Sequence, residues 1–444
     1  MQFALGVRVS SCHDGCVMSS VLTRFSLLAA IGVHRPPDAL LTPEQTEANI
    51  RRLVWEIGWF GVTWGTLFNF LQVYEVRLGA SSLLVGAITF GPAFVSIFWQ
   101  LPAARLITQK GHRMRWVIGG GFFYRLMFLL VAMVPFVLLQ GRAQATAGLW
   151  VLQAIPATVS NIAFLSMLAD AVPAQRMTQV VGWRMAAFGL TNTAATLLGG
   201  VLLQRIVFPL NFQVLFLIGF AASLVSWWHV KHIHVPDREP DRSGRRPLTR
   251  ELGRALRYPR FGRFLLAVGA LQLALGMIAP LLPLYWVREL GATDGQISII
   301  MTMFSGAMVV GSLTMRRLVG RIGRERALTA GTFGYALYPL MTSVSPSVWW
   351  LLPWAVLAGA LNAAITVTAF DNLVSVTPEA ERTHFIAVYN VAVNIALFTG
   401  PIVAGILAAN GAQIVLALQV AAGVALVAGV LMATRGVGER AVTA

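Results

Sequence analysis

Charged side chains are scarce in this chain of 444 residues, since Asp, Glu, Lys and Arg together make up 12% of it. A soluble domain carries about 25%. Cysteine is nearly absent, with two residues, which excludes a scaffold held together by disulfide bonds. No Gly-x-x-x-x-Gly-Lys-Ser/Thr loop occurs, so nothing predicts ATP binding. These absences argue against a soluble enzyme and against a disulfide-rich secreted domain.

Apolar residues are abundant instead, at 57% of the chain. Twelve stretches approach the length of about 20 apolar residues that a membrane-spanning helix needs. They cover approximately 53–74, 83–104, 116–139, 147–169, 180–204, 212–233, 262–286, 293–314, 327–345, 348–370, 384–408 and 412–433. We therefore expect an all-α polytopic membrane protein with twelve transmembrane helices. Its expected parts are tails at 1–48 and 434–444, six-helix bundles at 49–233 and 262–433, and a loop at 234–261.

The net charge of +16 is distributed unevenly along this pattern. With the N-terminus in the cytoplasm, the outer loops contain only Arg77, Arg142, Arg205 and Arg288, and Arg125 lies inside a span. The remaining Lys and Arg residues then face the cytoplasm, where such residues are enriched in membrane proteins. We expect both termini to be cytoplasmic, in a plasma membrane. The positive charge thus sets orientation, and no nucleic-acid partner is expected.

The basic loop between the two sets of spans has an amphipathic pattern. Leu248, Leu252 and Leu256 fall on one side of a helix, while Arg250 and Arg254 fall elsewhere. This pattern predicts a helix on the inner membrane surface that contacts anionic lipid.

The two sets of six spans have related sequences. Residues 73–80 recur as 284–292 with one insertion. The later matches, in order, are Arg105 with Arg317, Gly111 with Gly323, Asn161 with Asn362, and Asp170 with Asp371. Matches that keep their order along the chain indicate that the two halves are copies of one six-helix unit.

The layout resembles that of the major facilitator superfamily over about residues 45–434. The resemblance rests on the six-plus-six spans, the long basic central loop, and the basic loops after the second and eighth spans. Degenerate copies of the superfamily loop motif surround Gly111 and Gly323, with Thr108 at the position of the motif's aspartate. The resemblance implies two bundles that rock around a midplane site, with the first, fourth, seventh and tenth helices lining a cavity.

The expected substrate cavity is formed by polar and aromatic residues of the first span. Polar residues of the fourth, seventh and tenth spans complete it, as the resemblance implies. Gly58, Gly61 and Gly65 fall on another side of the first span, which suits close helix packing. The cavity candidates are Trp59, Thr63, Thr66, Asn69, Gln153, Asn161, Gln272, Asn362 and Thr366. The alternative for each amide or hydroxyl is a hydrogen bond between helices within the protein.

Ionisable residues inside the spans are few, and such residues are functional by default. Glu56 is the candidate for proton coupling, and the alternative is an ion pair with an arginine such as Arg184. We expect Asp170 and Asp371 to pair with arginines of the basic loops and to latch the outward-facing state, the alternative being plain solvation of helix ends. The arginine and loop candidates are Arg105, Gly111, Arg113, Arg317, Gly323 and Arg324.

The pattern as a whole predicts a secondary active transporter for a small neutral polar solute, with proton coupling through Glu56. Efflux of amphipathic drugs is an alternative, and a non-transporting membrane protein of the same fold is another. The spans contain no cluster of His, Cys and carboxylate side chains, so we expect neither an enzyme nor a metal site. No cofactor is expected, and we expect a monomer.

Overall fold

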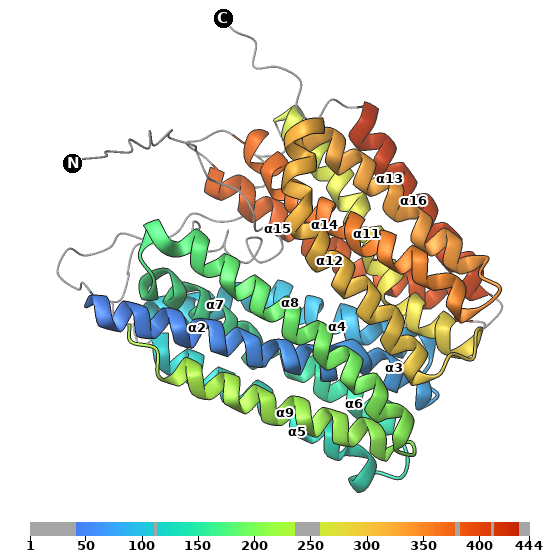
Figure 1. Ribbon diagram of the computed structural model, residues 1–444, viewed down its shortest axis with the longest axis horizontal. Helices are drawn as coiled ribbons and strands as arrows, with labels where there is room; N and C mark the ends of the chain where they lie inside the picture. The colour runs from blue at the N-terminus through green and yellow to red at the C-terminus, as the bar shows by residue number, and fades with distance from the viewer. Residues whose placement is uncertain (1–40, 111–112, 236–257, 378–381, 410–412, 435–444) are drawn as a thin grey trace, which may run out of the picture.

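The computed structural model describes residues 41–110, 113–235, 258–377, 382–409 and 413–434. Within these ranges the regular structure is helical, as expected for an all-α membrane protein, and the helices form two bundles that lie side by side (Figure 1). The two tails, the loop residue Gly111 and the amphipathic stretch of the central loop lie outside the described residues.

The helices occupy the twelve positions that the sequence predicts. The N-terminal half contains α2 (Pro43–Thr63), η1 (Trp64–Phe68), α3 (Asn69–Arg77), α4 (Ser82–Lys110), α5 (Arg113–Val137), α6 (Arg142–Leu152), α7 (Ala154–Ala171), α8 (Ala174–Arg205) and α9 (Leu210–Lys231). The C-terminal half contains α11 (Pro259–Arg288), α12 (Asp294–Ile322), α13 (Arg324–Ser343), η2 (Val348–Trp350), α14 (Leu351–Ser375), α15 (Arg382–Leu407) and α16 (Ile414–Thr434). Here η1 is a π-helical segment and η2 a 3₁₀ turn.

Ten of these helices in the described part of the chain are long and apolar enough to cross a membrane. The first predicted span, which η1 divides into α2 and α3, is not among the ten. The ninth, α13, also falls outside this group. Both nevertheless stand within the bundles, where α2 packs on α8 and α9, and α13 packs on α14 and α16.

Local sequence explains where the helices begin and turn. Thr42 accepts a hydrogen bond from the backbone of Gln45 and Gln45 accepts one from the backbone of Thr42, which caps α2. The turns that follow α3 and α11 contain Gly79 and Gly291, whose φ angles of 79° and 59° favour glycine. These glycines hold matching places in the two repeats, so the repeat is visible in the backbone as well as in the sequence.

The two halves meet at one end of the bundles. We call this the distal end, formed by residues 78–81, 138–141, 206–209 and 289–293, and the opposite end, where α2 begins, the tail end. Between α4 and α15, Gly86 packs against Pro401, and the rings of Phe94 and Phe398 lie 5.4 Å apart. Between α8 and α12, Gly200 packs against Ser298. These contacts lie in the distal parts of the four helices.

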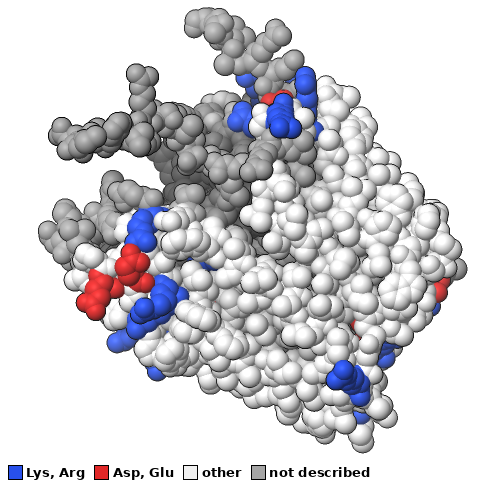
Figure 2. Space-filling view, viewed as in Figure 1, with Lys and Arg blue, Asp and Glu red and all other residues white. Residues whose placement is uncertain are grey.

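On the face shown in Figure 2, the exposed charged side chains lie at the two ends of the molecule. On the face shown, blue and red side chains gather at the tail end of each half and again at the distal end, and a broad white region separates them. Many large apolar side chains of the helices are exposed, among them Leu198, Leu313 and Val427. An uncharged belt of this kind is what contact with lipid hydrocarbon requires, and the chain is an integral multi-pass membrane protein.

Candidate functional site

The glycines of α2 and η1 form one packed side of the first span. An added Cβ at Gly61 would lie 2.2 Å from Thr191 Oγ1 and 2.8 Å from the Phe188 carbonyl oxygen on α8. At Gly65 it would lie 2.5 Å from the Asn192 carbonyl oxygen. Close packing on the glycine side, as predicted, is therefore present, and it joins the first span to α8.

A second side of the first span packs against α9. Thr63 Oγ1 donates a hydrogen bond to the Gly219 carbonyl oxygen over 3.0 Å, and Thr63 is fully buried. Thr66 Oγ1 donates to the Val62 carbonyl oxygen over 2.8 Å and lies beside Gly219. The structure thus differs from the expected cavity face, because both threonines pack against α9 and Thr63 is also hydrogen-bonded to it.

Asn69 also serves packing and does not project as a free amide. Its Nδ2 donates to Thr196 Oγ1 over 2.8 Å and to Asn192 Oδ1 over 3.2 Å, both on α8. The alternative reading of a hydrogen bond between helices is therefore the one that the structure shows for this residue.

Aromatic residues form the inner side of the first span. Phe68 lies 4.8 Å from Trp150 of α6 and 5.6 Å from Phe128 of α5, between ring centroids. Trp64 stacks on Phe68 at 4.3 Å and meets Phe188 of α8 edge-on at 5.9 Å. Because α5 and α6 stand across the bundle from the first span, these rings point into the interior of the N-terminal half.

We call Phe60, Trp64, Phe68 and Phe188 the aromatic row. It lies on the side of the bundle where the first span and α7 make few contacts with each other. The first span packs mainly on α8 and α9, whereas α7 packs mainly on α4 and α5, so few contacts join α2 to α7. Phe60, Trp64 and Phe68 are only half-buried. The row includes a π-helical segment, a feature frequent at functional sites, which no pattern in the sequence predicted.

Trp59 lies on the opposite, outer side of the first span. It is 37% exposed and Trp55, one turn earlier, is 56% exposed. The two packed sides, towards α8 and α9, separate this outer side from the aromatic row. The structure therefore does not place Trp59 in the expected cavity. Its exposure fits a position that faces lipid.

The amides on the other expected lining helices fall into two groups. Asn362 Oδ1 accepts a hydrogen bond from Thr366 Oγ1 over 3.4 Å and is also hydrogen-bonded to Tyr335 of α13. The half-buried Asn161 and Gln272 and the buried Gln153 show no side-chain hydrogen bond to any described residue. On α7, Asn161 shares a side with Phe164, whose ring lies below the Arg184 guanidinium at 5.3 Å in the bundle interior. Asn161 is therefore the amide best placed to meet a ligand beside the aromatic row.

Glu56 lies in a buried charge network that joins four helices, α2, α5, α8 and α9. Its Oε2 lies 2.7 Å from Arg184 Nη1, and both side chains are less than a tenth exposed. Ser226 Oγ donates to Glu56 Oε1 over 3.4 Å and accepts from Arg125 Nη2 over 3.3 Å. The ion-pair alternative for Glu56 is thus present in the structure, with Arg184 as the direct partner and Arg125 one hydrogen bond further away through Ser226.

Asp170 pairs with Arg113 at 2.6 Å, which joins the tail ends of α7 and α5. Both residues belong to the N-terminal half, and the pair is formed while the distal ends of the halves are in contact. A latch that holds only an outward-facing state does not follow from this geometry. The side chains of Arg105, Arg317 and Asp371 lie outside the described part of the structure. Gly323 ends α12 with a φ of 84°, and Arg324 is exposed.

A pair of arginines closes the distal end, and sequence analysis did not identify them as functional. Arg77 Nη2 lies 2.9 Å from Asp294 Oδ1 and donates to the Ala292 carbonyl oxygen of the other half. Arg288 donates to the Ala80 carbonyl oxygen, and to Ser82 Oγ over 3.4 Å. The repeat of 73–80 in 284–292 was the signal available, since it places both arginines at matching points. We call this set the distal gate.

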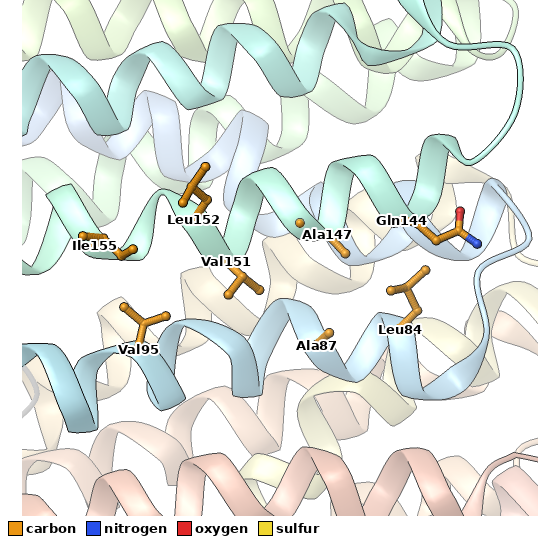
Figure 3. A pocket seen from close by; sticks show the side chains of 9 residues that line it. Leu84, Ala87, Val95, Gln144, Ala147, Val151, Leu152 and Ile155 are labelled. Atoms are coloured by element: carbon orange, nitrogen blue, oxygen red, sulfur yellow. The ribbon is translucent and has the colours of Figure 1, made fainter.

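A shallow groove of about 500 Å³ opens between α4 and α6–α7 (Figure 3). Its walls are mostly apolar and include Leu84, Ala87, Val95, Ala147, Val151 and Leu152, with Gln144 at one end. On α4 these positions lie opposite Thr89, which bonds to Gln72 of α3 inside the bundle. The groove is therefore on the outer, lipid-facing side and is separate from the aromatic row.

Fold and site together define a polytopic membrane protein built from two copies of a six-helix unit that meet at a distal gate. The family model described as Major Facilitator Superfamily matches residues 58–275 and 264–441. The chain belongs to the major facilitator superfamily, a family of membrane transporters.

Several named relatives share part of the sequence. The multidrug resistance protein MdtG of Dickeya zeae is 27% identical over 330 residues, which cover 69% of this chain and 74% of that protein. An uncharacterized MFS-type transporter of Methanocaldococcus jannaschii is 28% identical over 137 residues, and the class E tetracycline resistance protein of Escherichia coli is 26% identical over 136. The matched stretches span only 35% and 33% of those two relatives.

Solved structures agree in fold at low sequence identity. A structure of the nucleoside transporter NupG aligns with a TM-score of 0.71 at 12% identity, covering 87% of this chain and 99% of that one. The Escherichia coli fucose:proton symporter FucP aligns with a TM-score of 0.56 at 15% identity, covering 87% and 98%. At this identity the likeness concerns the fold alone.

Proposed function

We propose that the chain is a secondary active transporter that moves a small solute by alternating access. The distal gate supports this proposal, since it joins the two copies through a few polar contacts that can be broken and re-formed. We place the tails in the cytoplasm of a plasma membrane, which the Lys and Arg distribution favours, and on that orientation we infer an inward-facing state.

We further propose that the solute is an amphipathic molecule with an aromatic or flat apolar part. The observation that carries this proposal is the aromatic row, which presents half-buried rings to the bundle interior, while Asn161 on α7 has no side-chain hydrogen bond among the described residues. Ring stacking with one polar contact selects apolar surface more than a pattern of hydroxyl groups. The names of two partial relatives, a multidrug and a tetracycline resistance protein, point the same way. A sugar-like solute would need several free amides, and Asn69 and Asn362 are already hydrogen-bonded.

The experiment is a ligand-stabilisation screen of the purified protein against aromatic amphiphiles, sugars, amino acids and nucleosides. A ligand at 100 times its Kd stabilises the folded state by about 2.7 kcal/mol, which raises the melting temperature. We expect aromatic amphiphiles to give the shift and Trp64→Ala to abolish it.

Trp59→Ala is the matched control for that variant, because it removes the same side chain from the outer side of the same helix. It should leave the ligand-induced shift unchanged. A shift produced by sugars or nucleosides alone, or one that Trp59→Ala and Trp64→Ala reduce equally, would contradict the proposed site.

A further inference from the structure

Glu75, near the distal end of α3, is a buried acid that has no partner. Its relative exposure is 0%, and neither carboxylate oxygen has a hydrogen-bond partner among the described residues. Glu56 and Asp170, the other buried acids of the N-terminal half, are each paired with an arginine. Glu75 therefore stands apart from them chemically.

The charged groups on the elements around Glu75 are bonded to other residues, and the remaining titratable groups are uncharged tyrosines. Arg77, on the same helix, is bonded to Asp294 of α12. Arg142, the charged residue of α6, donates to the Leu138 carbonyl oxygen over 2.8 Å. The segment η1 and the distal part of α4 contain no charged residue.

The same holds for α11 and for the neighbouring tyrosines. Arg288 of α11 is bonded to Ala80 and Ser82 in the distal gate. Tyr285 of α11 accepts a hydrogen bond from Ser345 over 3.3 Å. Tyr74 packs between Phe212 and Phe216 of α9. Among the described residues, no charged side chain forms a hydrogen bond or an ion pair with Glu75.

The position of Glu75 links the aromatic row to the distal gate. It follows Phe68 by seven residues, about two helical turns, so it lies on the same inner side of the first span. It precedes Arg77 by two residues. On α6, Thr146 lies one turn from Trp150, the ring that Phe68 meets, and Thr146 Oγ1 is likewise buried without a partner. A second polar atom therefore faces the same part of the interior.

Burial without a partner determines the protonation state of this carboxyl. An ionised carboxylate away from water and from countercharge costs several kcal/mol, whereas the neutral acid costs far less. While the distal gate is closed, Glu75 is therefore the neutral acid. Opening of the gate would admit water to the end of α3 and allow the carboxyl to release its proton to the distal side.

We propose that Glu75 is the proton-binding group that couples opening of the distal gate to proton release, and that its protonation favours the closed state. This inference rests on the proposed alternating-access function. It replaces Glu56, the carboxyl that sequence analysis favoured for proton coupling, because Glu56 is already paired with Arg184.

The test measures the width of the distal end against pH. Spin labels are placed at two exposed positions of the distal end, after Cys12 and Cys16 are changed to Ser. They are Gln140→Cys, in the loop between α5 and α6, and Ser347→Cys, in the loop between α13 and η2. In reconstituted protein we expect the distance distribution to move from short to long as pH rises. Glu75→Gln, which imitates the neutral acid, should lose this response and stay short.

Glu289→Gln is the matched control, since it neutralises an exposed acid at the same end. It should retain the wild-type response to pH. If Glu75→Gln responds to pH as the wild type does, or if Glu289→Gln loses the response equally, the proposal is overturned.

A second measurement is made on the wild-type protein and uses a variant only to assign the signal. Infrared difference spectra between low and high pH should contain the carbonyl band of a buried protonated carboxyl, and Glu75→Asp should shift its frequency. Absence of such a band in the wild type would overturn the proposal. Neither readout requires a transported ligand, so a failed ligand screen would contradict the proposed solute and leave this result to be judged separately.

Discussion

Arg77 and Arg288 hold matching places in the two halves of the chain, and each donates hydrogen bonds to the half that it does not belong to. Arg77 reaches Ala292 and Arg288 reaches Ala80, which are themselves matching residues of the repeat. The symmetry ends at the next contact, because Arg77 also meets a carboxylate, Asp294, where Arg288 meets the hydroxyl of Ser82. The distal gate thus consists of two related contacts, only one of which is an ion pair.

This asymmetry predicts unequal effects on the conformational equilibrium. The hydrogen bonds of both arginines are charge-assisted, and such a bond contributes about 1.5–3 kcal/mol. Asp294→Asn removes the countercharge of Arg77 and should therefore lower the ratio of distally closed to distally open molecules about 10-fold, at about 1.4 kcal/mol per tenfold. Arg288→Lys keeps a charged donor at the contact with Ala80 and Ser82 and should lower it less. Distance distributions between labels at Gln140→Cys and Ser347→Cys report the ratio.

Glu289→Gln serves as the control for the gate, because Glu289 is an exposed acid at the same end with no ion pair among the described contacts. Equal populations in wild type and Asp294→Asn would show that the ion pair does not hold the gate closed.

The buried pair of Glu56 and Arg184 should matter for stability. Removing one member of a buried ion pair costs about 3–5 kcal/mol, since the other charge is left unpaired. Arg184→Gln should therefore lower the melting temperature markedly in detergent, and the double variant with Glu56→Gln should recover part of the loss. Arg176 is on α8, like Arg184, and forms an exposed ion pair with Glu47 of α2. Arg176→Gln should therefore have little effect on the melting temperature. An Arg184→Gln protein as stable as Arg176→Gln would contradict the burial of this network.

Close packing of the first span on α8 predicts a steric effect of small substitutions. Gly61→Ala and Gly65→Ala would bring Cβ atoms within 3 Å of backbone atoms of α8, so each should destabilise the fold by about 1–3 kcal/mol. Gly182→Ala, on α8 itself, is the control, because nothing lies within 4 Å of its added Cβ. Thermal unfolding of the three variants would show the difference, and identical melting temperatures would rule out the close approach.

The membrane fold and its repeat could be predicted from sequence. Long apolar runs follow from crossing a bilayer, and matches that keep their order follow from two copies of one six-helix unit. The helix start at Thr42 was equally predictable, because a capping box is a local pattern. Each of these features depends on residues close together in the chain or on its overall composition.

The candidate site was harder to predict because polarity does not indicate which side of a membrane helix faces a ligand. Thr63 and Thr66 form hydrogen bonds at the contact with α9, while apolar Phe60 and Trp64 face the interior. The π-helical segment also turns the residues after Trp64 relative to a regular helix. Glu75 was assigned to an outer loop, since the predicted span ended at residue 74, but the helix continues to Arg77.

Alternating access is the central claim, and paired distances at the two ends test it most directly. One pair of labels reports the distal end, at Gln140→Cys and Ser347→Cys, and a second reports the tail end, at Gln179→Cys and Arg326→Cys, all exposed positions. In reconstituted protein, addition of the ligand found by the stabilisation screen, or a change of pH, should shorten one distance while the other lengthens. Distances that stay fixed, or that change together, would contradict alternating access and favour a non-transporting protein of the same fold.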